Sequence, residues 1–214
     1  MAIAPLQRSY RTVRQLLGDP RRRSRTATAL AEEVFRATVT STTSLVDEQR
    51  FRETMSAFPA AVCVVTALDD GGRPRGLACS AVASLSVDPP LLLICVNQRN
   101  GSLRAIKHSG GFCVNLLRAG RGEISERFAS PSSDKFSGIT WRPSPVSGLP
   151  WLSSDTMAYV DCRLAAEIQA GTHAILVGNV RDAAPVRGAG EPLLHWRRTY
   201  GTWQGESPTV AVVR

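Results

Sequence analysis

The first periodic pattern in the chain predicts an amphipathic helix. Phe51, Met55 and Phe58 recur at spacings of four and three residues, so a helix would carry them on one face. Asp47 is a suitable N-cap, because its carboxylate can accept a hydrogen bond from a free backbone N–H of the first turn. Pro59 ends the segment, since the residue before a proline is pushed away from helical backbone.

From there the pattern changes to short apolar runs separated by turn residues, which is typical of strands. Two short helices are expected at 102–108 and 123–128, and a Pro-, Gly- and Ser-rich connection spans 131–150. Asp69-Asp70-Gly71-Gly72 predicts a hairpin turn, and Gly171 lies in a second tight turn. The expected strands are Val62–Leu68, Arg75–Leu85, Leu91–Val96, Phe112–Leu117, Ala158–Gln169, His173–Ala183 and Pro192–Tyr200. Hairpin-linked strands with few helices favour a small antiparallel barrel over a parallel α/β sheet.

Composition divides the chain into three zones. The 214 residues have a formal net charge of +8, yet residues 1–46 alone hold eight Arg and three acids, a net charge of +5. We therefore expect an Arg-rich N-terminal extension (1–46), partly disordered or helical, with a short helix near 28–38. The periodic body follows (47–200), and then a C-terminal tail (201–214). The nearly balanced body gives no reason to expect nucleic acid as a partner, although the basic extension leaves a non-catalytic binder open.

The sequence lacks the patterns of several common sites. It has no GxGxxG or GxxxxGK[ST] motif for a nucleotide, and no GxSxG, HExxH or HxH motif for hydrolysis or a metal. Its longest aliphatic run, Leu91–Val96, is far shorter than the roughly 20 residues that span a bilayer, so no membrane partner is expected. Widely spaced cysteines without a CxxC pair predict a reduced, cytoplasmic protein: Cys63, Cys79, Cys95, Cys113 and Cys162.

The most informative stretch runs from Arg75 to Asn97. It begins with small side chains, turns sharply at Asp88-Pro89-Pro90, and continues as a fully apolar strand expected to be buried. Small side chains allow a flat ligand to approach the backbone, whose amides can then form hydrogen bonds with it. Close packing of strands in a barrel explains the same composition, so both interpretations stay open.

This stretch resembles the flavin reductase family, the FMN-binding split-barrel reductases that accompany two-component flavin monooxygenases. Further matches occur in order along residues 50–200. The matching segments are Phe51–Phe58, Ala61–Thr66, Gly76–Pro90, Phe112–Leu117, Arg127–Ala129, Ala170–His173 with Val177–Val180, and Pro192–Tyr200. The resemblance implies a mainly β fold, an antiparallel, Greek-key-like split β-barrel with a few short helices.

The resemblance also implies a flavin site. Residues along the isoalloxazine would be Leu77, Ala78, Cys79, Ser80, Ala81 and Ser84, and those near the ribityl phosphate would be Val96, Asn97, Gln98, Arg99 and Ser102. Phe128 and Ala129 would enclose the phosphate or the ring edge. Lys135 is either a second phosphate cation or an ordinary surface lysine, and Asn115 either contacts the ligand or bonds the backbone as a buried amide. Cys79 is more simply a small packing residue than a redox group.

His173 is the residue that the resemblance places against the nicotinamide. Hydride transfer needs the nicotinamide C4 and flavin N5 within roughly 3–3.5 Å but needs no general base, so His173 would position the substrate rather than titrate. A histidine that caps the hairpin turn is the alternative. Tyr200, with His195 and Trp196, would line the nicotinamide side of the site. Alternatively, Tyr200 is an aromatic residue of the core.

The leading hypothesis is a homodimeric NAD(P)H:flavin oxidoreductase that supplies reduced flavin to a partner monooxygenase. Three departures from the family pattern leave FMN or FAD and NADH or NADPH open: Pro59-Ala60-Ala61, Ala78-Cys79-Ser80 and Gly171-Thr172-His173. One alternative is a flavoprotein with tightly bound FMN that reduces an organic substrate directly. The other is the non-catalytic binder that uses the basic extension.

Overall fold

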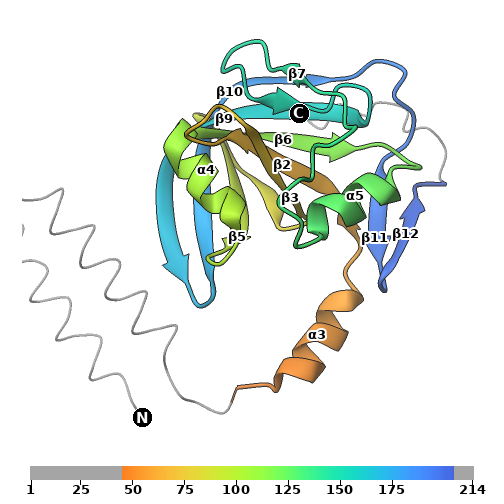
Figure 1. Ribbon diagram of the computed structural model, residues 1–214. Helices are drawn as coiled ribbons and strands as arrows, with labels where there is room; N and C mark the ends of the chain where they lie inside the picture. Colours follow the sequence, from red (N-terminus) through yellow and green to blue (C-terminus); the bar gives the residue numbers. More distant parts are fainter. Residues whose placement is uncertain (1–44, 205–214) are drawn as a thin grey trace, which may run out of the picture. The chain divides into compact units, whose positions relative to one another are not determined.

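The computed structural model describes residues 45–204, which form mainly antiparallel β-structure (Figure 1). The helices are α3 (Glu48–Ser56), α4 (Gly101–Ser109) and α5 (Gly122–Ala129). The strands are β1 (Ala60–Ala61), β2 (Cys63–Leu68), β3 (Pro74–Cys79), β4 (Val82–Val87), β5 (Pro90–Asn97), β6 (Gly111–Leu117), β7 (Arg142–Pro143), β8 (Pro150–Trp151), β9 (Thr156–Ala170), β10 (His173–Pro185), β11 (Leu193–Trp196) and β12 (Thr199–Thr202).

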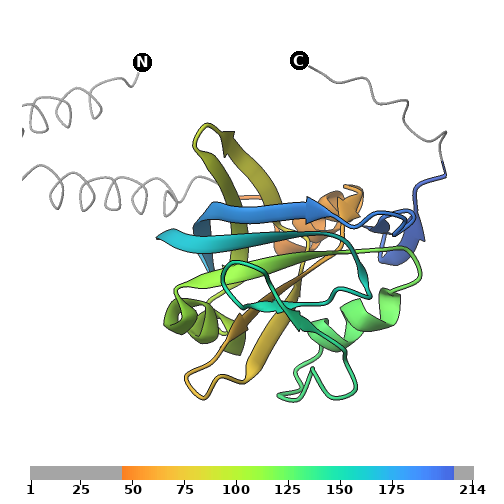
Figure 2. The same ribbon diagram turned by 90° about the horizontal axis from the view of Figure 1, so that it is seen from above.

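Seven of these strands form one sheet in the order β3-β2-β6-β9-β10-β5-β4, and every pairing is antiparallel. The sheet curls on itself, while the β4–β5 hairpin projects from it (Figure 2). The chain passes from β3 at one edge of the sheet to β4 at the other through Ser80 and Ala81, and the carbonyl of Ala81 accepts a hydrogen bond from the backbone N–H of Cys95 on β5 over 3.0 Å. The mainly β, antiparallel barrel expected from the sequence is therefore confirmed.

The predicted strand Arg75–Leu85 is wrong as a single element. The structure ends β3 at Cys79 and begins β4 at Val82, so Ser80 and Ala81 lie between the two strands. β3 pairs with β2, whereas β4 pairs with β5 on the far side of the sheet. One apolar run supplies both strands because the chain changes its ladder partner at the two intervening residues, and this change leaves no mark in the hydrophobic pattern.

The barrel interior is built by alternation along the strands. On β5, Leu92, Ile94 and Val96 are buried, whereas the residues between them are only half-buried, so the strand that was expected to be buried is buried on one face only. Phe112 on β6 is completely buried among these residues. It packs against Gly178 of β10, where an added Cβ would come within 2.8 Å of its ring. Glycine at this position therefore lets the aromatic ring fill the barrel.

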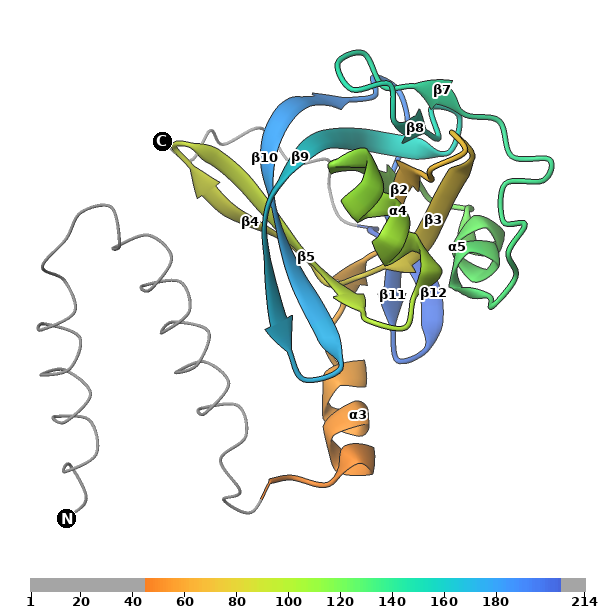
Figure 3. The ribbon, with the colours of Figure 1, turned by 60° about the vertical axis from the view of Figure 1, so that its left-hand side comes forward.

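A second group of buried residues forms beneath α5. Phe128 of this helix packs on β3, where a Cβ added to Gly76 would come within 2.7 Å of its ring. Phe136 meets Phe128 edge to face, with 5.0 Å between the ring centroids. Figure 3 shows α4 and α5 on either side of β3, with the connection that follows α5 beside them. This arrangement positions the site described below.

The predicted strand Pro192–Tyr200 is instead a hairpin, β11 and β12. The two turn residues, Arg197 and Arg198, have φ values of 47° and 64°, the left-handed region that two-residue hairpin turns require. Asn and Gly are the usual residues there, so a pair of arginines gave no turn signal in the sequence.

The predicted helix is confirmed as α3, with Asp47 as its N-cap: the backbone N–H of Arg50 donates to the Asp47 carboxylate over 2.9 Å. Its apolar stripe is exposed, however, with Phe51 55% and Phe58 63% accessible. The indole N–H of Trp196 ties the end of the helix to β11 by donating to the carbonyl of Ala57 over 3.0 Å.

The predicted helix near 28–38 and most of the predicted tail lie outside the described residues. Among the helices of residues 45–204, none combines the length and the apolar character that crossing a membrane would require.

Candidate functional site

The β9–β10 turn brings His173 beside the end of β5. His173 pairs across the ladder with Asn97, and both residues are exposed on the outer side of the barrel. Gly171, with φ of 56°, makes the turn tight enough for this pairing. The turn that carries His173 and the strand end that leads to Arg99 are therefore neighbours.

Gln98 ties these two segments together. Its backbone N–H donates to the carbonyl of Thr172 over 3.0 Å, and its side-chain amide donates to Gln169 Oε1 over 2.8 Å. The same amide donates to the carbonyls of Gly171 and His173, each at 3.3 Å. Gln98 was predicted to contact flavin, but its side-chain amide donates its hydrogen bonds to the turn that carries His173.

The His173 ring is oriented by its neighbour. Thr172 Oγ1 lies 3.0 Å from His173 Nδ1. When the threonine hydroxyl donates to Nδ1, the ring proton lies on Nε2, which is then the donor available to a ligand. Thr172, part of a departure from the family pattern, therefore provides an orienting hydrogen bond to the histidine ring.

The predicted isoalloxazine segment divides into buried and exposed residues. Leu77 and Cys79 point into the barrel, and Ala78 is half-buried. The exposed members, which a ligand can reach, are Ser80, Ala81 and Ser84. Only part of the predicted segment therefore presents side chains to solvent.

Cys79 has the properties of a packing residue. Its Sγ lies 3.7 Å from the carbonyl oxygen of Ala81 and 3.6 Å from that of Cys95. Burial raises the pKa of the Cys79 thiol, which keeps it protonated and poorly nucleophilic at neutral pH. These observations favour packing at this position over redox chemistry.

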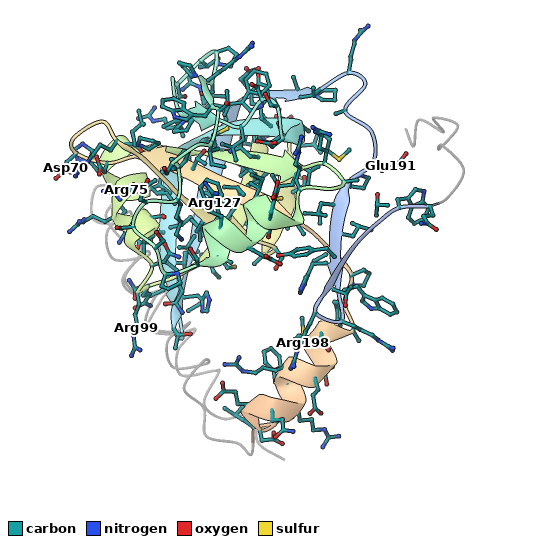
Figure 4. The ribbon with its side chains drawn as sticks, turned by 45° about the vertical axis from the view of Figure 1, so that its right-hand side comes forward. Asp70, Arg75, Arg99, Arg127, Glu191 and Arg198 are labelled. Atoms are coloured by element: carbon teal, nitrogen blue, oxygen red, sulfur yellow. The ribbon has the colours of Figure 1, made fainter. Side chains whose placement is uncertain are left out.

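A cleft of about 690 Å³ opens between α4, β3 and the connection that follows α5. Four of the predicted residues line it: Arg99, Ser102, Ala129 and Lys135. In Figure 4, Arg99 lies near one end of α4 and Asp70 near the other, with Arg75 on the same side of the molecule. The residues that the sequence reasoning missed include Arg75, Arg104, His108, Phe136 and the serines Ser130, Ser132 and Ser133.

The cleft is cationic. Arg73 and Arg75 form ion pairs with Asp69 at 3.1 and 2.9 Å, whereas Arg99, Arg104 and Lys135 have no ion pair within residues 45–204. Partial burial lowers the pKa of the Lys135 ammonium, whose Nζ donates to the carbonyl of Phe128 over 2.8 Å. Cations without an ion-pair partner in a cleft are suited to a phosphate-bearing ligand.

The Asp69 carboxylate accepts its hydrogen bonds from other groups of the protein. Desolvation raises its pKa, but hydrogen bonds from the backbone N–H of Arg73, the Arg75 side chain and the backbone N–H of Gly71 outweigh this effect and lower the pKa to about 2. The carboxylate therefore stays ionised at neutral pH and organises Arg75, whose guanidinium also donates to the carbonyl of Ser133 over 3.0 Å. Arg75 thus ties β3 to the opposite wall of the cleft.

Asn115, Val96 and Phe128 are buried and do not line the cleft. The side-chain amide of Asn115 donates to the carbonyl of Val64 at 3.1 Å, and its oxygen accepts from the backbone N–H of Leu152 at 2.8 Å. Asn115 is completely buried, so its amide serves the backbone, the second of its two interpretations.

Tyr200 packs under α5. Its hydroxyl donates to Ser125 Oγ over 3.0 Å, and its ring lies against Gly122 and 5.4 Å from the ring of His195. These contacts place Tyr200 beside the second core group and away from the lining of the cleft. They favour the core interpretation of this aromatic side chain.

The described residues fit a flavin nucleotide. The cleft supplies cations for its phosphate. Ser80 and Ala81, exposed between β3 and β4, supply backbone groups for a flat ring. Asn97, at the end of β5, connects these two parts of the site. Arg104 was not predicted as a site residue, although the sequence contained a weak indication of it. Arg104 lies four residues before His108, so the two share one face of the helix.

Comparison with known proteins agrees with this geometry. The family model for the flavin reductase like domain matches residues 55–204. A flavin reductase (NADH) of Kitasatospora aureofaciens is 43% identical over 162 residues, 76% of this chain and 85% of that protein. A flavin reductase (NADPH) of Lentzea aerocolonigenes is 38% identical over 72% of this chain and 89% of its own length.

Relatives described as monooxygenase components are also similar. The reductase subunit HsaB of a flavin-dependent monooxygenase of Mycobacterium tuberculosis is 37% identical over 78% of this chain and 88% of its own length. The crystal structure of a nitrilotriacetate monooxygenase component B from Mycobacterium thermoresistibile superimposes with a TM-score of 0.72 at 37% identity, covering 78% of this chain and 93% of that one. The chain therefore belongs to the flavin reductase-like family, whose split-barrel fold it shares.

Proposed function

We propose that this protein is an NAD(P)H:flavin oxidoreductase, which transfers a hydride from a nicotinamide to a flavin. One structural observation supports the proposal in addition to family membership. Asn97 pairs with His173, and Arg99, two residues further on, lines the cationic cleft. A nicotinamide beside His173 would therefore meet, at the end of β5, the ring of a flavin whose phosphate lies in the cleft.

The residues act by position. The Thr172 hydroxyl and the Gln98 amide fix the His173 ring and its turn, so that Nε2 can donate to the carboxamide of a nicotinamide. Arg99 and Lys135 neutralise the phosphate of a flavin. A bound flavin supplies the hydride acceptor, so no residue of the chain has to remove a proton from the nicotinamide.

The proposal is tested by mixing the protein with NADH or NADPH and with FMN or FAD, and following absorbance at 340 nm. We expect oxidation of the nicotinamide that depends on added flavin. Gel filtration of the protein before the assay separates a flavin substrate from a prosthetic group, because only a tightly bound flavin stays with the protein. If no combination gives flavin-dependent oxidation, the proposal is wrong.

A partner monooxygenase is the proposed consumer of the reduced flavin. The support is the resemblance to reductase subunits of monooxygenases such as HsaB. The Cys79 thiol and the four other free cysteines support a reducing, cytoplasmic location, because disulfides persist in oxidising compartments.

A homodimer is also proposed, on the basis of the outer face of β5 and β10. Leu93 pairs with Val177 and Cys95 with Ile175 on this face, and all four are only half-buried. Apolar side chains gathered on an outer face are typical of protein interfaces. Light scattering should give about twice the chain mass of 23.1 kDa, and a monomer that retains full activity would contradict the dimer.

A further inference from the structure

The cleft is longer than one phosphate requires. Gly101, Arg104 and His108 line it at spacings of three and four residues, so a full face of α4 forms one wall. From Gly101 to His108 this wall extends about 10 Å at 1.5 Å per residue. The opposite face of the helix carries Leu103 and Ile106 into the core, which keeps the wall rigid.

The charges are spread along this length. Arg99 precedes α4, and Arg104 lies one turn into it, on the cleft side. Lys135 lies on the opposite wall. Since none of the three has an ion pair within the described part of the chain, all three are available to an anion. A single compact phosphate cannot contact cations distributed over a helix face, whereas a diphosphate with an attached nucleoside can.

The remaining lining residues fit a nucleoside. Phe136 and His108 offer flat rings on which a purine can stack. The hydroxyls of Ser130, Ser132 and Ser133 offer hydrogen bonds to a ribose. A volume of about 690 Å³ lies within the range of pockets that enclose small molecules of this size.

We infer that the cleft binds the adenosine diphosphate half of FAD, with Arg104 and His108 as the residues that select FAD over FMN. This inference rests on the proposed function, because it takes the flavin ring to lie at the end of β5. NADH contains the same adenosine diphosphate group, but the cleft continues from Arg99, on the flavin side of the Asn97–His173 pair.

The test measures KM and kcat for FAD, FMN and riboflavin at saturating nicotinamide. The wild-type protein should have a KM for FAD about tenfold below that for FMN, which corresponds to one charge-assisted contact. Arg104→Gln and His108→Ala should raise the KM for FAD about tenfold and leave kcat and the KM for FMN within about twofold. Arg187→Gln is the matched control, since Arg187 is exposed and outside the cleft.

A binding measurement makes the test independent of turnover. Calorimetry with ADP as the probe should show binding to wild-type and Arg187→Gln proteins and at least tenfold weaker binding to Arg104→Gln. Equal loss for FMN and FAD in Arg104→Gln, or a raised KM for NADH alone, would overturn the inference. A protein that binds ADP in the cleft but reduces no flavin would instead overturn the proposed function.

Discussion

The side-chain amide of Gln98 donates to the backbone carbonyl of His173 over 3.3 Å. Gln98 belongs to the segment that leads from β5 to the cationic cleft, and His173 begins β10. This bond, with those to Gly171 and Gln169, fixes the turn on which His173 is presented. The segment that leads to the cleft and the turn that carries His173 are therefore joined through this side chain as well as through the backbone.

Removing the Gln98 amide should loosen the His173 turn. Gln98→Ala is expected to raise the KM for the nicotinamide about threefold to tenfold, because the hydrogen bonds that orient the turn are lost. The KM for flavin should change by less than about twofold, since Gln98 directs its amide away from the cleft. Gln49→Ala on α3 is the control, and a rise in the flavin KM alone would show that Gln98 contacts flavin instead.

His173 and Thr172 should act on nicotinamide binding in a graded way. His173→Ala removes the donor itself and should raise the nicotinamide KM more than tenfold, whereas Thr172→Val removes only the orienting hydroxyl and should raise it less. Steady-state kinetics at saturating flavin measures both effects. If His173→Ala leaves the nicotinamide KM unchanged, the histidine only caps the turn.

Lys135 should matter only to flavins that carry phosphate. Lys135→Met is expected to raise the KM for FMN and for FAD about tenfold, because it removes a cation from the cleft, and to leave the KM for riboflavin unchanged. Lys107→Met is a matched control, since Lys107 is paired with Glu167 and does not line the cleft. An equal effect on riboflavin would contradict a phosphate contact.

Asn115 should affect stability without affecting flavin binding. Asn115→Ala leaves the backbone N–H of Leu152 and the carbonyl of Val64 without their buried partner, at an expected cost of about 2–4 kcal/mol in the free energy of unfolding. Urea unfolding measures this loss, with the exposed Asn179→Ala as control. A large rise in flavin KM together with unchanged stability would place Asn115 in the ligand site.

Asp69 should contribute stability that depends on pH. Its pKa is lowered to about 2 in the folded chain, compared with about 3.9 in an unfolded chain, so folding favours the ionised carboxylate. Its stabilisation is therefore fully present above about pH 5 and is lost as the pH falls toward 2. Urea midpoints of wild-type and Asp69→Asn proteins should differ at pH 7 and converge near pH 2. A difference that stays constant with pH would contradict this role.

The hydrophobic pattern determined much of the barrel. Short apolar runs bounded by turn residues defined β6, β9 and β10, because such runs are typical of buried strands. Helix α3 followed equally from local signals, the Asp47 cap and the proline after it. Such features depend on residues near one another in the chain, and the motifs that resemble the family lie on them.

Other features depend on residues that are distant in the sequence. The break at Ser80 and Ala81 exists because β3 and β4 pair with different partners, which no local pattern records. The turn at Arg197 and Arg198 likewise lacks the usual turn residues.

The site shows the same division between local pattern and tertiary arrangement. The sequence by itself offered Arg99 and Lys135 as candidate cations for a phosphate, and its resemblance to the family implied His173 for the nicotinamide. Only the tertiary structure decided that Arg104 and His108 share their cleft and that Asn115 and Tyr200 do not line it. The physical reason is that a cleft is a space between α4, β3 and the connection after α5, and its lining is fixed by how these segments pack.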